Sequence, residues 1–244
     1  MKLGYQTITW GGVVGQAQGV TSIKDLFYQT YGNTAKALED IASVGFAGIE
    51  IFDGNLAEYA EKPEEFKNLL TKNNLTLVSV YTGANFIYDE ILDDEFHKIN
   101  KAIELAKTFG ATNLIVGGGA QRASGIRETD YQKLATQLDR VTDLAAVAGL
   151  TACFHPHLTT IVEGPEQLAK LMNLSKIAFC PDTAHLAAGG GNPAELIRQY
   201  PDRVKHVHLK DFQKSFQHLK KLTIKVGQLL SLMVTTVIQK KPLQ

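Results

Sequence analysis

The sequence predicts an α/β protein of the (β/α)8 barrel class, whose last unit, after about residue 212, is atypical or incomplete. Short runs rich in Val, Ile and Leu alternate with longer segments of helical period, the pattern of parallel strands joined by helices. These runs begin roughly every 33 residues between Leu3 and Val204, close to the size of one strand and its crossover helix. A length of 244 residues suits one such barrel.

The expected strands are apolar runs of four to seven residues that end near turn-forming or polar residues. They are Leu3–Thr9, Gly48–Phe52, Leu75–Tyr81, Asn113–Val116, Thr151–His155, Lys176–Cys180 and Val204–Leu209. An eighth strand over Leu232–Ile238 is favoured by β-propensity alone.

The expected helices carry their own start and stop signals. Asn33 precedes an apolar stripe that ends before Gly45, and Asn192 followed by Pro193 is a cap with a proline at the first helical position. Pro165 repeats that device. Further stripes over residues 96–106 and 134–148 close at Gly110 and Gly149.

Composition argues against a disordered, collagen-like or coiled-coil protein. Hydrophobic residues are 44% and charged residues 20%, and the 25 Lys and Arg balance the 25 Asp and Glu. A neutral chain has no overall field toward nucleic acid or a membrane surface, so we expect neither as a partner. Without a secretory signal, a long apolar run or more than two cysteines, the sequence predicts a cytoplasmic protein with reduced thiols.

Charge also divides the chain into two parts. Residues 1–212 form the predicted barrel body and hold every acidic residue, whereas residues 213–244 contain six Lys and no Asp or Glu. Such a shift in composition indicates a boundary. We expect an atypical basic C-terminal segment in place of the last helix and strand.

Polar side chains gather at the ends of the fifth, sixth and seventh expected strands. In a parallel barrel the active site forms at the carboxyl ends of the strands. Period-two alternation puts His155 and Cys153 on one strand face, and Asp182 and Cys180 on another. With His208 from the seventh strand, His155 and Asp182 make a two-imidazole, one-carboxylate set, which is typical of a divalent first-row metal. The cysteines lie deeper, as core residues.

Other polar or aromatic residues leave alternatives open. Glu50, at the end of the second strand, is predicted either to meet substrate as a hydrogen-bonding group or base, or to be a buried supporting carboxylate. Trp10 is expected either to stack on a sugar ring or to plug the barrel mouth. Gly117–Gly119 and Gly189–Gly191 suggest phosphate cradles, but they lack the spacing of known phosphate loops and are ordinary where strands turn into helices.

Five segments carry a family resemblance: LGYQTITWG, GFAGIEIFD, FHPHLTTIVEGPEQL, CPDTAHLAAGGGNP and HVHLKD. Through them the chain resembles the xylose isomerase-like TIM-barrel superfamily, in the branch of sugar phosphate isomerases/epimerases and inosose dehydratases. This implies an enzyme with a divalent metal ion (Mn, Co or Zn) that acts on a small-molecule sugar or inositol-derived ketone. The implied chemistry removes a proton next to the carbonyl and passes through a metal-bound enediolate.

The resemblance also implies roles for individual residues. Asp182 and His208 look like family metal ligands, and His157 and His185 like substrate-contacting residues. Many relatives have a Glu where this chain has His155, and the HPH motif is more similar to the inosose dehydratases.

A larger departure lies in the C-terminal segment, which lacks the strand-eight Glu that relatives use as a ligand and often as a base. Without it, the candidates for catalytic proton transfer are Glu50, His157, His185 and Lys210. The missing Glu leaves open a non-catalytic or inactive sugar-binding paralogue. An endonuclease IV-like DNA-repair nuclease is disfavoured by the even charge. Barrels of this kind often pair, so a homodimer is a further expectation.

Overall fold

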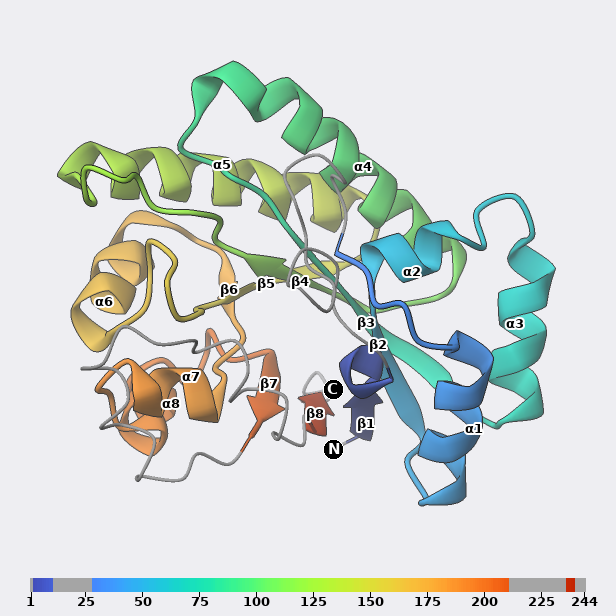
Figure 1. Cartoon of the computed structure of the whole chain (residues 1–244). Coiled ribbons are helices and arrows are strands. Elements are labelled where there is room, and N and C mark those ends of the chain that lie inside the picture. Colours follow the sequence, from blue (N-terminus) through green and yellow to red (C-terminus); the bar gives the residue numbers. More distant parts are fainter. Residues whose placement is uncertain (1, 11–27, 211–235, 240–244) are drawn as a thin grey trace.

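A computed structural model describes residues 2–10, 28–210 and 236–239, with strands at the centre and helices around them (Figure 1). The strands are β1 (Lys2–Gln6), β2 (Gly48–Phe52), β3 (Thr76–Gly83), β4 (Asn113–Gly117), β5 (Thr151–His155), β6 (Ala178–Phe179), β7 (His206–Leu209) and β8 (Thr236–Gln239). The α-helices are α1 (Thr34–Ser43), α2 (Asp53–Ala57), α3 (Pro63–Lys72), α4 (Leu92–Thr108), α5 (Glu128–Val147), α6 (Pro165–Leu174), α7 (Thr183–Ala188) and α8 (Pro193–Gln199). Two short 3-10 helices are η1 (Thr7–Thr9) and η3 (Asp89–Ile91).

The sheet order shows how the barrel closes. The strands lie in the order β6-β5-β4-β3-β2-β1-β8-β7, and β1 to β6 are parallel to one another. Parallel bridges Phe179↔Val204 and Asp182↔His208 then join the β6 end of the sheet to β7. The (β/α)8 barrel prediction is confirmed in its class, with one change in the last strand.

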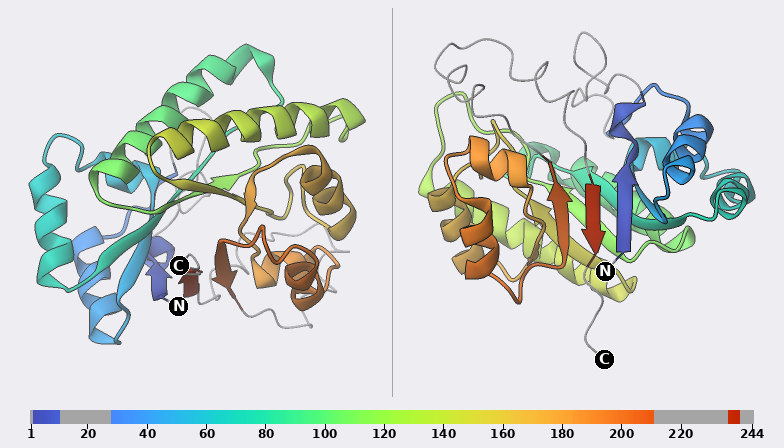
Figure 2. Two further views of the ribbon diagram at one scale, coloured as in Figure 1. Left: turned by 180° about the vertical axis from the view of Figure 1, so that it is seen from behind. Right: turned by 90° about the horizontal axis from the view of Figure 1, so that it is seen from below.

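That change is the direction of β8. It is antiparallel to both of its neighbours: Thr236 pairs with Tyr5 and Leu209, and Gln239 with Lys2 and His206. Figure 2 shows the β8 arrow pointing opposite to those of β1 and β7. The expected eighth strand forms over its last residues, whereas 232–235 and the predicted boundary at 212 lie outside the described residues. A parallel strand must be reached by a crossover, but an antiparallel one need not be.

Three expected strands are shorter than predicted, and one of them, β7, begins at His206 instead of Val204, which makes only an isolated bridge to Phe179. β1 ends at Gln6, where the Gln6 side chain accepts the N–H of Ile8 and the chain enters η1. β6 is reduced to Ala178–Phe179 because the backbone N–H of Lys176 donates to Asp139 of α5 instead of to the sheet. By contrast, β2 and β5 have the predicted bounds.

The predicted start and stop residues of the helices cap them in the structure. The Asn33 side chain accepts the N–H of Lys36, and that of Asn192 accepts N–H groups at the start of α8. Gly149, with φ of +82°, adopts the left-handed conformation that ends α5. The apolar stripes pack on the outside of the sheet, so that side chains alternate between this layer and the barrel interior. The interior holds Phe52, Tyr81, Ile115, Cys153 and Cys180.

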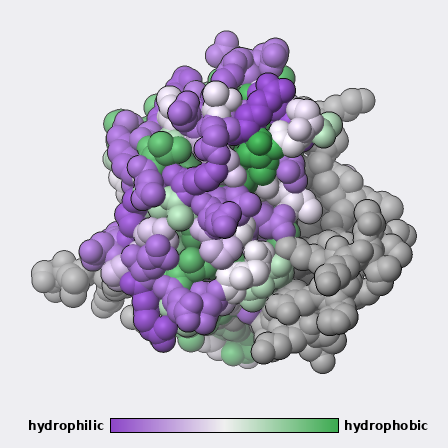
Figure 3. All heavy atoms as spheres, turned by 90° about the vertical axis from the view of Figure 1, so that its left-hand side faces the viewer, coloured by the Kyte–Doolittle hydropathy of each residue, from purple (hydrophilic) through white to green (hydrophobic). Residues whose placement is uncertain are grey.

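The described surface offers little apolar area on the face shown in Figure 3. Hydrophilic residues predominate there, and hydrophobic residues appear in small, separate groups. Among helices within the described ranges, none combines the length and apolarity needed to cross a bilayer.

We predict that β8 is required for a stable monomeric barrel. Deleting residues 236–244 would leave the facing edges of β1 and β7 unpaired and lower the free energy of unfolding by several kcal/mol, at about 1 kcal/mol per ladder hydrogen bond. Urea unfolding and light scattering would measure the lost stability and the resulting association. A chain lacking only residues 240–244 is the control; equal behaviour of the two deletions would contradict the prediction.

Candidate metal centre and active site

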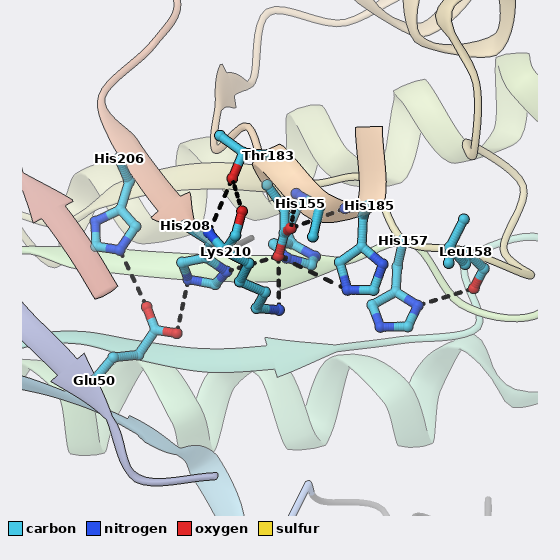
Figure 4. Close-up of polar contacts among 11 residues, drawn as sticks. Glu50, His155, His157, Leu158, Thr183, His185, His206, His208 and Lys210 are labelled. Carbon is cyan, nitrogen blue, oxygen red and sulfur yellow. Dashed lines mark hydrogen bonds and ion pairs between the residues drawn. The ribbon is translucent and has the colours of Figure 1, made fainter. Parts of the chain in front are cut away.

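The carboxyl ends of β5, β6 and β7 bring together the three predicted metal ligands. His155 ends β5, Asp182 follows β6, and His208 lies in β7. One ligand atom from each lies within 4.8 Å of the other two, and all three side chains are buried. Figure 4 shows the His155 and His208 rings close together.

Asp182 lies at the centre of this cluster because each of its oxygens has a separate task. Oδ1 caps α7 by accepting the backbone N–H groups of Ala184 and His185, both at 3.0 Å. Oδ2 lies 3.1 Å from His155 Nε2 and 2.7 Å from Lys210 Nζ. His208 Nδ1 is 3.7 Å from the same oxygen. The helix cap thus fixes the orientation of the carboxylate toward the other ligands.

Burial and neighbouring charges set the protonation of these groups. Burial raises the pKa of Asp182, but Lys210 and the surrounding histidines outweigh it and hold the pKa well below its usual range. Burial lowers the pKa of His155 to about 3, so its imidazole is neutral and can donate a lone pair. For His208, burial acts to lower the pKa, but the nearby Glu50 carboxylate outweighs it and raises the pKa.

Unpartnered nitrogens make the cluster suitable for a cation. His155 Nδ1, His185 Nδ1 and His208 Nδ1 are buried and have no hydrogen-bond partner among the described residues. Buried polar atoms without partners are costly, and a bound ion would use such lone pairs. Two imidazoles and a carboxylate fit a divalent first-row metal such as Zn²⁺, Co²⁺ or Mn²⁺.

A second group of possible ligands lies deeper in the barrel. Cys180, His206 and His208 also have atoms within 4.8 Å of one another. Burial raises the pKa of the Cys180 thiol well above its usual value, so this group offers no ligand that is already ionised, whereas the other group contains the Asp182 carboxylate. The group containing Asp182 therefore fits a metal better.

Glu50 occupies the barrel interior. Its side chain is fully buried, accepts the Ser79 hydroxyl at 2.6 Å, and lies 3.2 Å from His206 Nε2 and 2.9 Å from His208 Nε2. Protein groups thus surround both carboxylate oxygens (Figure 4). Of the two alternatives, these contacts support the buried carboxylate that holds the β7 histidines in place.

His157 has the geometry of a proton acceptor. Its Nδ1 lies 2.9 Å from the Leu158 carbonyl oxygen, which can only accept, so Nδ1 carries the proton and Nε2 keeps its lone pair. Burial lowers the pKa of His157, which favours the neutral ring. The His185 ring lies 3.9 Å away, centroid to centroid.

Lys210 approaches the cluster from the end of β7. Its backbone N–H donates to the Thr183 hydroxyl at 2.9 Å, and that hydroxyl donates to the Lys210 carbonyl, so the backbone is tied to the start of α7. This anchor directs the ammonium to Asp182.

Trp10 contacts the first strand and the first helix. Its indole N–H donates to Asp40 of α1 at 3.1 Å, and its ring packs edge-on against Tyr5. These contacts support a packing role for Trp10 against the outer helix layer, and its stacking on a sugar ring stays a prediction.

A cavity of about 320 Å³ adjoins the cluster at the ends of β3, β4 and β5. His157 lines it together with residues that the sequence analysis missed: Tyr28, Tyr81, Asn85, Glu95, Lys98 and Thr159. Thr159 has a φ of +65°, a strained conformation of the kind that clusters at functional sites. Position at the end of an expected strand was the available signal for Tyr81, and position shortly after one was the signal for Asn85 and Thr159.

The first glycine run also lines this cavity, but for a packing reason. A Cβ on Gly117 would meet the Tyr81 hydroxyl at 2.8 Å, and one on Gly119 would meet the Ala84 carbonyl oxygen at 2.3 Å. Glycine at these positions lets neighbouring groups approach the backbone. This supports the ordinary turn interpretation over a phosphate cradle.

This fold and site match a known family. The sequence profile of the xylose isomerase-like TIM barrel family matches residues 38–228, and the chain belongs to that family.

Two kinds of relative show how far the similarity extends. Inosose dehydratase from Lacticaseibacillus casei is 25% identical over an alignment of length 194 that covers 73% of this chain and 63% of that protein. The chain therefore spans less than two thirds of that relative's length. Two solved structures share the fold at 17% identity. The probable 3-DHS dehydratase AsbF from Bacillus anthracis has a TM-score of 0.68, covering 93% of this chain and 81% of its own, and the zinc-bound IOLI protein has a TM-score of 0.65, covering 88% and 74%.

We predict that Glu50 stabilises the barrel. Replacing it with Ala leaves buried histidines without their carboxylate and should lower the free energy of unfolding by about 3–5 kcal/mol. Urea denaturation measures this loss. Glu64→Ala, at an ion pair on the exposed face of α3, is the control and should change stability little. Equal stability of the two variants would show that Glu50 is dispensable for the fold.

Proposed function

We propose that the chain is a divalent-metal-dependent enzyme that removes a proton next to the carbonyl of a polyhydroxy ketone. The observation that carries this proposal is the convergence of His155, Asp182 and His208 beside a cavity that His157 also lines. The similarity to inosose dehydratases supports a cyclic polyol ketone such as an inosose as substrate. The zinc-bound IOLI protein, which has the same fold, supports a divalent metal as the cofactor.

In this proposal His155, Asp182 and His208 hold the ion, and Mn, Co and Zn all suit the ligand set. The ion, when bound, acts as a Lewis acid toward the substrate carbonyl. His157 Nε2 accepts the proton from the carbon next to the carbonyl, and the electron pair of that C–H bond moves toward the carbonyl oxygen. The Lys210 ammonium lies where it can stabilise that negative charge, and His185 packs on the base.

Two outcomes follow from the enediolate of the substrate. Return of the proton to the former carbonyl carbon, with loss of the adjacent hydroxyl proton, gives isomerisation, and its return to the original carbon from the opposite face gives epimerisation. Loss of a β-hydroxyl, which leaves as water after it takes up a proton, gives dehydration. The dehydratase relative supports the second outcome.

One observation favours a non-catalytic sugar-binding protein as the second candidate. Strand β8 is antiparallel, its sequence TVIQ has no carboxylate, and the expected strand-eight Glu is absent from residues 213–244. Turnover of inososes and unphosphorylated ketoses with Mn²⁺, Co²⁺ or Zn²⁺ separates the two functions. Metal binding without turnover of any of these ketones would favour the second candidate.

We predict that Asp182→Asn loses the metal and keeps the fold. Asparagine is also a good helix cap, so α7 should persist, whereas loss of the carboxylate charge should reduce bound metal at least about tenfold. Elemental analysis measures the metal, and circular dichroism the fold. Asp143→Asn, at an exposed ion pair, is the matched control. Full retention of metal by Asp182→Asn would rule out this ligand set.

We predict that His157→Gln lowers kcat by about 10²–10⁴, since general bases contribute rate factors of that size. Metal content should stay unchanged because His157 is not among the proposed ligands. Steady-state kinetics on the ketone with the highest turnover measures the effect, and exposed His97→Gln of α4 is the control. A wild-type kcat in His157→Gln would exclude His157 as the base.

A further inference from the structure

A buried ion pair forms part of the cavity wall and has no role in the proposed proton transfer. Lys98 and Glu95 lie one turn apart on α4, with Nζ and Oε2 separated by 2.7 Å. Their side chains are only 7% and 3% exposed, and both line the cavity that reaches His157.

The pair is unusual for its position on the helix. Ala102 and Leu105, further along the same side of α4, are apolar and buried. Replacing a buried ion pair with packed apolar residues is often neutral or stabilising, so fold stability alone does not explain two charges here. A pair that faces a cavity beside a proposed active site has a ready explanation in binding.

The carboxylate holds the ammonium in place. Glu95 Oε1 accepts the backbone N–H of Asn85 at 3.0 Å and its side-chain amide at 2.8 Å, while Asn85 Oδ1 accepts the N–H of Ala120 at 3.0 Å. Glu95 Oε2 has Lys98 as its ion-pair partner. Glu95 is the one ion-pair partner of the Lys98 ammonium among the described residues, and the three N–H donors of a lysine ammonium then include some for an oxygen in the cavity.

Charge balance indicates the kind of ligand. Among the described residues that line the cavity, Lys98 and Glu95 are the charged side chains and cancel each other. The other polar side chains are hydroxyl or amide groups and neutral His157, and burial keeps the Tyr28 and Tyr81 phenols protonated by raising the pKa of each. A phosphate group would meet no net positive charge there, whereas neutral hydroxyls would find both donors and acceptors.

We propose that Lys98, positioned by Glu95, donates to a hydroxyl oxygen of the substrate and makes the cavity a subsite for uncharged polyols. This rests on the proposed function and adds to it the substrate class and a specificity-determining residue. The subsite lies on the β3–β4 side of His157, so it would hold hydroxyls remote from the reacting carbonyl.

The test uses myo-inositol, which lacks a carbonyl and is not turned over, titrated calorimetrically into metal-loaded protein. Lys98→Met/Glu95→Gln removes the pair without leaving a lone buried charge. Lys101→Met/Glu104→Gln is the control, because that pair has the same spacing on the same helix but is exposed. We expect about 10–100-fold weaker binding in the first variant, unchanged metal content, and wild-type affinity in the control. Equal affinity in all three proteins would overturn the proposal.

A second measurement needs only the wild-type protein and decides the question if the first variant does not fold. We expect myo-inositol to bind at least about tenfold more tightly than its monophosphate, and tighter binding of the phosphate would overturn the proposal. Ketone turnover in the same samples separates the two hypotheses. If Lys98→Met/Glu95→Gln loses polyol binding and the wild-type protein turns over no ketone, the proposed reaction alone is refuted. Turnover with unchanged polyol binding in Lys98→Met/Glu95→Gln would refute the subsite alone.

Discussion

The carboxylate of Asp182 is the constraint on which the candidate site depends. One oxygen is held by two backbone N–H groups at the start of α7, so the other cannot turn away from His155 and Lys210. The group is fully buried, and its positive neighbours keep it ionised despite that burial. A single turn between strand and helix thereby determines both a helix start and the geometry of the proposed ligands. Deeper in the barrel, the Glu50 carboxylate orients His206 and His208 of β7 in a similar way, and it does not line the cavity.

Much of this arrangement could be predicted from local patterns. The period of the apolar runs indicates the barrel, and the rule that parallel strands end at one edge brings His155, Asp182 and His208 together. Both inferences need only the pattern within each short segment and the fixed geometry of parallel strands. The helix caps at Asn33 and Asn192 were equally predictable, because a cap is a contact within three residues.

The features that could not be predicted depend on distant partners. Residues Thr236–Gln239 have the same propensity in either direction, so only the path of the chain decides that β8 is antiparallel. The Trp10 indole finds its acceptor 30 residues away. Glu95 and Lys98 have the same i, i+3 spacing as Glu104 and Lys101 in reverse order, and only the packing of α4 on the sheet makes one pair buried and the other exposed.

The position of β8 between β1 and β7 also affects how the protein can be made. During synthesis the strands emerge in order, and six of them can pair with their predecessor as soon as the intervening helix is complete. The barrel itself cannot close, because the last strand must insert between the first strand and the seventh. Until residue 239 leaves the ribosome, the edges of β1 and β7 stay open to other nascent chains, so the growing chain passes through a stage at which it can associate instead of closing.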